Sequence, residues 1–256
     1  FAGNDVVEFV TDIDAAVVAV KKMLTEKKLT QADIDLKCRK VLAAKYWCGL
    51  NEISPVVEKE IEADLSSNWN IALIRNLYAN ALTVINNNEN IIPVRDLDKT
   101  RIAVVSVNKS RSSAFQDRIL SYYPADTFLI DTSDSDRCNE LAMKLSGYDL
   151  VIAGIFSADQ RPQNNYGIRP GLVSFLGKLV DSNNTIVTYF GNPYALARLD
   201  PLQRSGGLIV AYQENEFTED LSAQLIFGGI EGSGRLPVTI NKRWPEGHGI
   251  NTGGNI

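Results

Sequence analysis

Hydrophobic residues in the second half of the chain gather in short continuous runs, with amphipathic stretches between them. The runs are rich in valine and isoleucine and cover residues 101–107, 127–131, 150–156, 185–190 and 207–212, with a last one at 236–240. Apolar residues at helical spacing lie between them, over 113–122, 136–146, 170–180 and 218–227. Strands that are apolar on both faces and alternate with helices are typical of a parallel sheet covered on both sides. The pattern therefore predicts an α/β fold with a mostly parallel, doubly wound sheet.

The first fifty residues have a different pattern, in which one short β-prone run precedes two helices. The run ends at Phe9, and Thr11 can cap a helix that continues to about Glu26. A second helix is expected to begin after Thr30, which has an acidic residue three positions on, and to end near Gly49. Because one strand and two helices do not complete a domain, we interpret this part as the end of another unit.

These patterns divide the chain into three parts. Residues 1–60 are predicted to hold the end of one unit and a polar connector, and residues 61–240 an α/β sandwich domain. A strongly periodic helix over 70–86 is expected near the start of that domain. Residues 241–256 are polar and rich in glycine, so we expect a linker or tail there.

Composition removes several classes of partner. The 256 residues include 26 Lys and Arg against 31 Asp and Glu, and no basic run exceeds two residues, so we expect no nucleic-acid partner. No apolar run reaches the roughly 18 residues that a membrane span requires. The three cysteines show no CxxC spacing, which argues against a zinc site and a disulfide framework. We therefore expect no membrane span, no metal and no cofactor.

Two common catalytic or binding motifs are missing. The turn at residues 108–113 has no glycine, whereas a dinucleotide site needs glycines so that the backbone can approach the pyrophosphate. Lys109 and Arg111 in this turn could contact an anion, but solvated turn residues are the favoured interpretation. The only histidine, His248, lies in the Gly-rich tail and is expected to be a solvated linker residue. Without a GxSxG elbow or a well-supported histidine, a Ser-His hydrolase is excluded.

An acidic cluster follows the second predicted strand of the sheet. Asp131, Asp134 and Asp136 resemble an oxygen-rich metal loop, but the glycine and terminal glutamate of a calcium hand are missing. The cluster lies where a strand gives way to a helix, a position that favours helix caps and turns. We expect caps here and no metal.

Two loops at the carboxyl ends of predicted strands are the better candidates for a binding site, because ligands of open α/β sheets bind there. The longer one covers residues 157–169 and includes Asp159, Gln160 and Arg161, a mixture of amide and charged groups that suits carbohydrate. A solvated or interface loop fits equally well. The second loop, residues 191–194, is most simply a tight turn that leads into a helix.

Four segments in order resemble glycoside hydrolase family 3. The run AGNDVVEF and its following helix are similar to the end of the family's catalytic barrel. The next helix matches its I-D-x-x-x-R-x-x-L-x-x-K-x-x-x-G-L pattern at Ile34, Asp35, Arg39, Leu42, Lys45, Gly49 and Leu50. The segment that begins the family's second domain is similar to ALTVINNNENIIPVRDL in this chain. The segment that ends that domain is similar to FGGIEGSGRLPVTI, residues 227–240.

This resemblance implies a piece of a larger enzyme. It implies the last strand and helices of a (β/α)8 barrel followed by an α/β sandwich domain, with the nucleophilic aspartate of a retaining mechanism upstream, so no catalytic residue is expected in this chain. The β-glucosidase branch carries a glutamate after the third sandwich strand in a G-E-x-P-Y-x-E-like pattern. Here Gly154 is followed by Ile, Phe and Ser. That difference favours the β-N-acetylhexosaminidase branch, whose acid/base is a His–Asp pair on a barrel loop.

The resemblance also implies partners. We expect a carbohydrate substrate for the intact enzyme, a catalytic barrel packed against the sandwich domain, and a periplasmic or secreted location. Some proteins of this branch continue into a serine β-lactamase-like domain, which a Gly-rich linker would suit. Glu8, near the carboxyl end of the first strand, could line the sugar pocket, although an exposed loop carboxylate fits equally well. A non-catalytic glycan-binding or scaffold module and the β-glucosidase branch remain the alternatives.

Overall fold

The computed structural model describes residues 3–52, 54–156 and 159–254. It divides into two compact units, residues 1–65 (unit 1) and residues 66–256 (unit 2), and each is described by itself. In the described residues, no helix combines the length and the apolar character needed to cross a bilayer.

Unit 1 consists of helices and one 3-10 turn, and one of its two predicted helix caps is the one that the sequence indicates. They are α1 (Ile13–Thr25), α2 (Gln31–Trp47), the 3-10 turn η1 (Glu58–Glu60) and α3 (Ile61–Leu65). Thr30 and Asp33 form a reciprocal capping box at the start of α2, which confirms that helix boundary. Asp12, and not Thr11, caps α1 by accepting a hydrogen bond from the Ala15 N–H.

The strand expected over residues 1–9 is not formed by residues 3–9, which are irregular and exposed. A strand needs a hydrogen-bonded neighbour, and the described part of unit 1 contains no other extended segment to pair with it. Asp5 anchors this segment, because its carboxylate accepts hydrogen bonds from Lys37 and Lys40 of α2.

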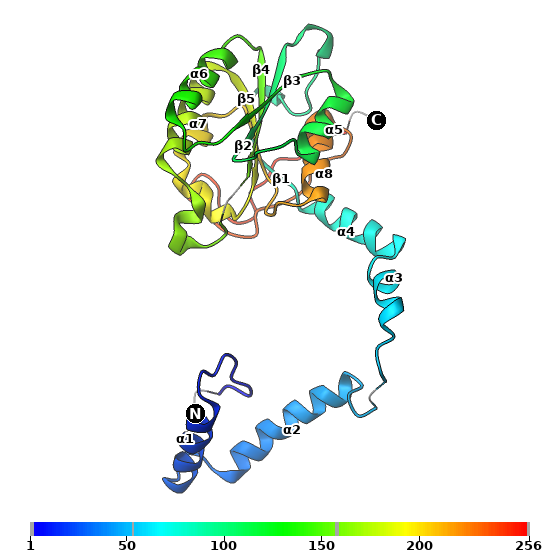
Figure 1. Ribbon diagram of the computed structural model, residues 1–256, viewed down its shortest axis with the longest axis vertical. Helices are drawn as coiled ribbons and strands as arrows, with labels where there is room; N and C mark the ends of the chain where they lie inside the picture. Colours follow the sequence, from blue (N-terminus) through cyan, green and yellow to red (C-terminus); the bar gives the residue numbers. More distant parts are fainter. Residues whose placement is uncertain (1–2, 53, 157–158, 255–256) are drawn as a thin grey trace. The chain divides into compact units, whose positions relative to one another are not determined.

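Unit 2 is built on a six-stranded sheet in the order β1-β6-β5-β4-β2-β3 (Figure 1). Its strands are β1 (Thr83–Asn87), β2 (Ile102–Val107), β3 (Asp126–Ile130), β4 (Leu150–Phe156), β5 (Asn184–Phe190) and β6 (Gly207–Val210). Strand β1 is antiparallel to β6 and all other pairs are parallel. This arrangement confirms the predicted α/β class with a mostly parallel sheet.

Helices cover both faces of this sheet, as Figure 1 shows. They are α4 (Asn68–Ala81), α5 (Ala114–Tyr122), α6 (Ser135–Leu145), α7 (Pro170–Ser182) and α8 (Glu216–Phe227), with 3-10 turns η2 (Asn88–Asn90), η3 (Leu97–Lys99), η4 (Pro162–Gly167), η5 (Pro193–Arg198) and η6 (Asp200–Arg204). Helices α6 and α7 pack in one apolar cluster, and α5 and α8 pack in the other. Every residue of β2 and β4 is buried, as expected of strands covered on both sides.

The first strand of the sheet lies where the sequence pattern predicts the last turn of a helix over residues 70–86. The helix ends at Ala81, and the β-branched run that starts at Thr83 forms β1 at the edge of the sheet. Pairing with β6, more than 120 residues later, overrides the helical periodicity, with Thr83 opposite Val210.

The tail was predicted to be a linker, and that prediction is wrong for residues 241–254. Trp244 is fully buried in the core on the α6–α7 side, and its Nε1 donates a hydrogen bond to Asn86 Oδ1 at 3.3 Å. His248, expected to be solvated, donates from Nε2 to the Ile85 carbonyl at 3.0 Å, and the Ile250 N–H donates to the Val84 carbonyl at 2.8 Å. The tail therefore covers the exposed edge of β1, a role that edge strands require of some neighbour.

The strand expected at residues 236–240 is also not formed. Its apolar residues are buried, since Leu236 is 1% exposed and Ile240 is 8% exposed, but the segment is irregular. Hydrogen bonds to the folded-back tail, such as Leu236 N–H to the His248 carbonyl at 2.9 Å, satisfy its backbone in place of a ladder.

Candidate functional site

The topology of unit 2 singles out the carboxyl edge of the sheet next to β2 and β4. The chain runs from β2 outward to β3 and then returns across β2 to β4, so the strand order reverses between these neighbours. Open α/β sheets bind ligands in the crevice at such a reversal. The loops after β2, β4, β5 and β6 all lie at this edge.

Asn108 fixes the geometry of this edge. Its backbone N–H donates to the Ile130 carbonyl at the end of β3, at 2.7 Å, and its Nδ2 donates to the Phe156 carbonyl at the end of β4, at 3.3 Å. Its Oδ1 accepts a hydrogen bond from Thr132 at 3.0 Å. One left-handed residue, with φ of 66°, therefore ties the ends of three strands together.

The loop after β4 is organised around Asp159. Its carboxylate accepts hydrogen bonds from the Arg161 backbone N–H at 2.8 Å, from Arg161 Nε at 3.0 Å and Nη2 at 2.9 Å, and from Asn164. The Arg161 hydrogen bonds, followed by that of Asn164, hold the pKa of Asp159 well below its usual range. Asp159 is therefore an ionised carboxylate that stiffens its own loop.

The two candidate loops from the sequence come together at this edge. Asn192, from the loop after β5, donates to the Gln160 carbonyl at 3.2 Å. Arg198 of η5 hydrogen-bonds to Asn165 and lies 5.6 Å from the centre of the Tyr166 ring. Residues 157 and 158, the start of the longer loop, lie outside the described residues. A sugar-binding role for Asp159, Gln160 and Arg161 stays a prediction.

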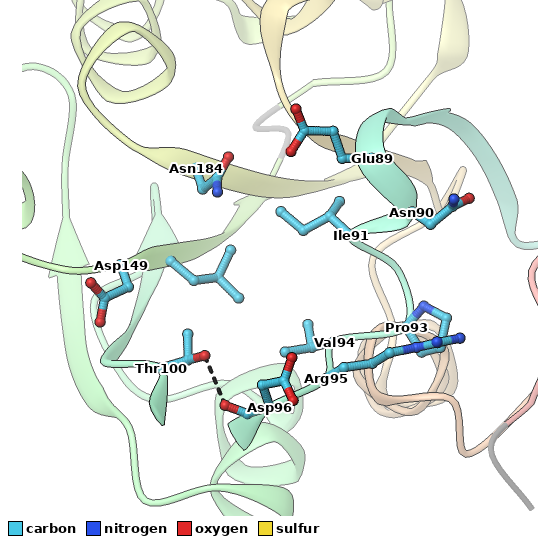
Figure 2. Close-up of a pocket in the computed structure, with 11 residues that line it drawn as sticks. Glu89, Asn90, Ile91, Pro93, Val94, Arg95, Asp96, Thr100, Asp149 and Asn184 are labelled. Atoms are coloured by element: carbon cyan, nitrogen blue, oxygen red, sulfur yellow. Dashed lines mark hydrogen bonds between the residues drawn. The ribbon is translucent and has the colours of Figure 1, made fainter. Parts of the chain in front are cut away.

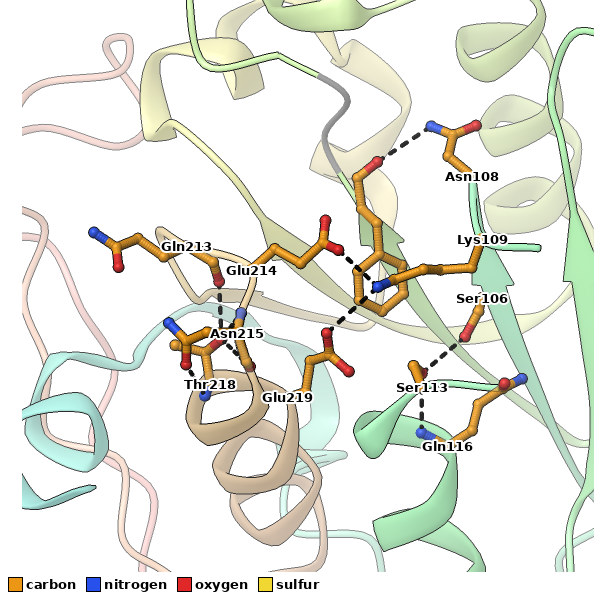
Figure 3. A network of polar contacts seen from close by, with 11 residues as sticks. Ser106, Asn108, Lys109, Ser113, Gln116, Gln213, Glu214, Asn215, Thr218 and Glu219 are labelled. Atoms are coloured by element: carbon orange, nitrogen blue, oxygen red, sulfur yellow. Dashed lines mark hydrogen bonds and ion pairs between the residues drawn. The ribbon is translucent and has the colours of Figure 1, made fainter. Parts of the chain in front are cut away.

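Figure 3 shows a second polar network at the same edge, built around Lys109. The Lys109 Nζ lies 2.6 Å from Glu214 Oε1, 3.6 Å from Glu219 Oε1 and 4.5 Å from the centre of the Phe156 ring. The prediction that Lys109 is a solvated turn residue is therefore wrong: its side chain is 23% exposed and paired with two carboxylates. Arg111, in the same turn, is exposed as expected.

Glu219 is the buried member of this network. Its side chain is 7% exposed, and burial raises its pKa, although Lys109 and the backbone N–H groups of Phe115 and Ala114 act in the opposite direction. Sequence reasoning missed Glu219 because, in the sequence, it is an ordinary acidic residue in the first turn of α8.

The acidic cluster after β3 serves the local backbone. Asp134 caps α6 by accepting a hydrogen bond from the Arg137 N–H at 3.1 Å, and Asp136 lies in the first turn of the helix. Asp131 accepts from the Ser133 N–H at 2.9 Å. The prediction of caps and turns is confirmed. Within residues 3–52, 54–156 and 159–254, no group of three or more His, Cys, Asp or Glu side chains is arranged to hold a metal ion.

Glu8 lies in unit 1, in the irregular segment before α1, and is exposed. A pocket-lining role for Glu8 therefore remains a prediction for a larger assembly.

A separate cavity of about 360 Å³ opens at the opposite, amino edge of the sheet (Figure 2). Its walls carry the carboxylates of Glu89, Asp96 and Asp149, and the amide of Asn184. Asp149 is already used, because its Oδ2 accepts a hydrogen bond from the Arg101 N–H at 2.8 Å. The carboxyl edge, and not this cavity, is the place where the topology favours a ligand.

Comparison with solved structures identifies proteins of the same fold. One is a fungal multi-domain GH3 β-N-acetylglucosaminidase, with 20% identity and a TM-score of 0.60, covering 90% of this chain and 26% of that one. Another is a glycoside hydrolase family 3 β-N-acetylglucosaminidase from Paenibacillus sp., with 16% identity and a TM-score of 0.62, covering 89% and 43%. A β-glucosidase from Erythrobacter marinus has 13% identity and a TM-score of 0.65, covering 91% and 42%.

This chain thus spans less than half of the length of each of these solved chains. No protein-family profile and no curated protein sequence matches it. The resemblance drawn from the sequence is confirmed at the level of the fold, which is that of one part of longer glycosidase chains.

Proposed function

We propose that this chain is the C-terminal portion of a glycoside hydrolase family 3 enzyme that hydrolyses β-N-acetylglucosaminides with retention of configuration. In this proposal unit 1 completes the catalytic barrel, and unit 2 is the accessory α/β sandwich. The ordered sequence matches support the family, and the partial coverage of the solved neighbours supports the assignment as a portion.

The observation that carries the proposal is the apolar surface of unit 1. No described residue of unit 1 is buried, whereas unit 2 has an apolar cluster on each face of its sheet. Phe9 is 97% exposed, Trp47 86% and Ile13 71%. Isolated exposed apolar residues are common, but a unit with no core at all needs a partner that covers it. The remainder of a barrel is such a partner.

Helix α4 of unit 2 shows the same feature on one face. Trp69, Leu73 and Leu77 recur at four-residue spacing and are 71%, 40% and 61% exposed. The other face is anchored to α8, through the stacked rings of Tyr78 and Phe217, whose centres are 6.2 Å apart. We infer that the exposed stripe also packs against the rest of the enzyme.

The lack of a glutamate in the loop after β4 favours the N-acetylglucosaminidase branch over the β-glucosidase branch. Residues 157–169 contain no glutamate, and their one carboxylate, Asp159, is engaged by Arg161 and Asn164. A general acid needs a carboxyl group that is protonated at the working pH, whereas the pKa of Asp159 is held low. The acid/base group is therefore expected on the barrel.

The direct test compares this chain with a version extended upstream through the complete barrel. We expect no turnover by the short chain, and turnover of an aryl N-acetyl-β-glucosaminide by the extended one. Robust activity of the short chain would contradict its assignment as a non-catalytic portion, and preference for an aryl β-glucoside would contradict the branch.

A paired substitution tests the apolar surface. Replacing Phe9 and Trp47 with serine is expected to reduce aggregation of the short chain, because the two rings are exposed to water there and the substitution removes them. In the extended protein the same two substitutions are expected to lower the unfolding midpoint, because the barrel covers both rings and their contacts are lost. Lys22→Ala, on the exposed surface of α1, is the control and should change neither property. An unchanged unfolding midpoint of the extended Ser variant would refute the covered surface.

Glycan binding by the loops after β4 and β5 is a second candidate function. The side chain of Tyr194 favours it, because this residue is 47% exposed and lies beside Asn192. Tyr194→Ala and Gln160→Ala in the extended protein are expected to raise KM for oligosaccharides without changing kcat. If both constants are unchanged, the loops serve only packing.

A further inference from the structure

The two edges of the sheet in unit 2 differ in how they are protected. Strand β1 has a shift in register between Val84 and Asn86, and the C-terminal tail lies along it. At the other edge, β3 forms five consecutive pairs with β2 without any shift in register. Proteins commonly protect an edge strand with a lysine, a proline, a bulge or a covering segment. Residues 126–130 contain no lysine, proline or bulge, and three of the five are exposed, so the outer side of β3 is open to another strand.

The backbone of β3 shows which groups face outward. The Ile130 carbonyl accepts a hydrogen bond from the N–H of Asn108, at the end of β2, so the backbone groups of Ile130 point toward β2. Successive residues of a strand direct their backbone groups to opposite sides. Phe128 therefore also faces β2, whereas Thr127 and Leu129 present their N–H and carbonyl groups to the outside.

These two residues are complementary to themselves in a second copy of the chain. In an antiparallel pair, Thr127 of each copy lies opposite Leu129 of the other, and Phe128 lies opposite itself on the two-fold axis. Each of the two hydrogen-bonded pairs exchanges two bonds, so all four outward groups of each copy are satisfied. A register centred on Thr127 or on Leu129 would place the other residue opposite Ala125 or Asp131, outside the strand.

The charges near the ends of β3 match in the same register. Asp126 begins the strand, and Arg137 of α6 lines a surface hollow with Leu129 and Asp131 at its carboxyl end. The two-fold axis sets the carboxyl end of one β3 beside the amino end of the other, so Arg137 comes close to Asp126 of the second copy. Within the described residues, neither Asp126 nor Arg137 forms an ion pair. Asp126 lies opposite Ile130, so no like charges face each other.

An apolar strip on the α5 side of β3 is covered by the same pairing. Leu129 is 36% exposed, and Leu120 of α5 is 42% exposed. Leu120 lies one helical turn after Gln116, whose amide donates to the Phe128 carbonyl at 3.1 Å, so it lies on the flank of α5 nearest β3. Backbone groups, charges and apolar side chains therefore all fit a second copy of this chain.

We propose that unit 2 forms a symmetric dimer in which β3 pairs antiparallel with β3 of a second copy, joining two six-stranded sheets into one. Because the strand has only five residues, the interface is small, and the dimer is weak and depends on protein concentration. This inference is independent of the proposed glycosidase function, because it concerns residues of unit 2 alone.

A cysteine on the two-fold axis tests the register. Phe128→Cys is made in the full chain after the exposed Cys38 and Cys48 are replaced by serine. Opposite residues of a non-hydrogen-bonded pair have Cα atoms about 4.5 Å apart, so oxidation with copper phenanthroline should give a covalent dimer that a reductant reverses. In Thr127→Cys the two thiols are diagonal neighbours, about 7–8 Å apart, and should cross-link at least about tenfold more slowly.

Solution association gives a second measurement that does not depend on the cysteine variants. Every protein carries Phe9→Ser and Trp47→Ser, so that the exposed rings of unit 1 do not contribute. Sedimentation equilibrium at about 0.1 mM protein should show a dimer. Leu129→Lys changes an exposed side chain and should raise the dissociation constant at least about tenfold, because a lysine at an edge opposes strand pairing. Arg137→Glu should raise it about fivefold in low salt and less in high salt.

Met143 provides the matched control. It is 77% exposed, and it lies four residues after Asn139, which contacts Lys178 of α7, on the side of α6 away from β3. Met143→Lys should dimerise like its parent protein, and Met143→Cys should not cross-link.

Three results would overturn the proposal for this chain. They are a monomeric parent protein at this concentration, cross-linking of Phe128→Cys no faster than that of Met143→Cys, and equal dimerisation of Leu129→Lys and Met143→Lys. A monomeric version extended through the barrel would overturn it for the intact enzyme, because another part of that protein would then cover β3.

Discussion

Removal of the Trp244 side chain tests whether the C-terminal tail is part of the folded domain. Trp244 is fully buried in the core on the α6–α7 side, and its indole N–H donates to Asn86, which is 3% exposed. Trp244→Ala removes the largest fully buried side chain and leaves Asn86 Oδ1 without this donor. Loss of a buried tryptophan costs about 3–5 kcal/mol, of which about 1 kcal/mol belongs to the hydrogen bond.

Two matched variants separate the contributions. Trp244→Phe keeps most of the ring volume but not the donor, so we expect a loss of about 1–3 kcal/mol. Trp47→Ala removes a side chain that is 86% exposed and should change the free energy of unfolding by less than about 0.5 kcal/mol in this chain.

Urea unfolding followed by far-UV circular dichroism gives the free energies, and tryptophan fluorescence gives a local readout. The chain has three tryptophans, and the other two, Trp47 and Trp69, are 86% and 71% exposed. The emission that acrylamide fails to quench should therefore come from Trp244 and disappear in Trp244→Ala. A loss below about 0.5 kcal/mol, with unchanged quenching, would refute the packed tail.

Three further predictions concern charge and backbone packing in unit 2. Burial alone would raise the pKa of Asp220, but hydrogen bonds from Arg75 and Arg118 lower it below the ordinary value of 3.8. The stability that ionised Asp220 contributes is therefore complete above pH 3.8 and is lost as pH falls through the lower pKa of the folded chain. Asp220→Ala should lower the free energy of unfolding by about 1–2 kcal/mol at neutral pH, measured by urea unfolding. The pH dependence is opposite for Glu219, because burial raises its pKa and the folded chain binds the proton more tightly than the unfolded chain. The free energy of unfolding of wild type, relative to Glu219→Gln, should therefore rise as pH falls toward the ordinary value of 4.5. A difference between the two proteins that does not change with pH would contradict the burial of Glu219. Gly234→Ala should destabilise by about 2–4 kcal/mol, because the added methyl group would overlap the Leu82 carbonyl, whereas Gly253→Ala, with open space around it, should melt like wild type.

Local features of the fold were accessible from the sequence. Thr30 and Asp33 form their capping box within four residues of chain, and Asp134 caps α6 through a residue three positions away. The buried runs of β2, β4, β5 and β6 indicate their own surroundings, because a strand covered on both faces must be apolar throughout. The pair formed by Asp159 and Arg161 is equally local, although its geometry was not predicted.

The central network of the site depends on contacts that no local pattern encodes. Lys109 meets Glu214 and Glu219 across more than a hundred residues, and only the sheet topology brings the turn after β2 to the first turn of α8. The perturbed pKa of Glu219 has the same origin, because burial is produced by packing and not by neighbours in the sequence.

The sequence by itself therefore determined the helix caps, the apolar strands and the α/β class, since each depends on interactions a few residues apart. Only the folded structure shows that Thr83–Asn87 is an edge strand, that Trp244 folds back onto it, and that Glu219 pairs with Lys109. In each of these cases the partner is distant in the chain, and the free energy comes from excluding water around groups that meet only after folding.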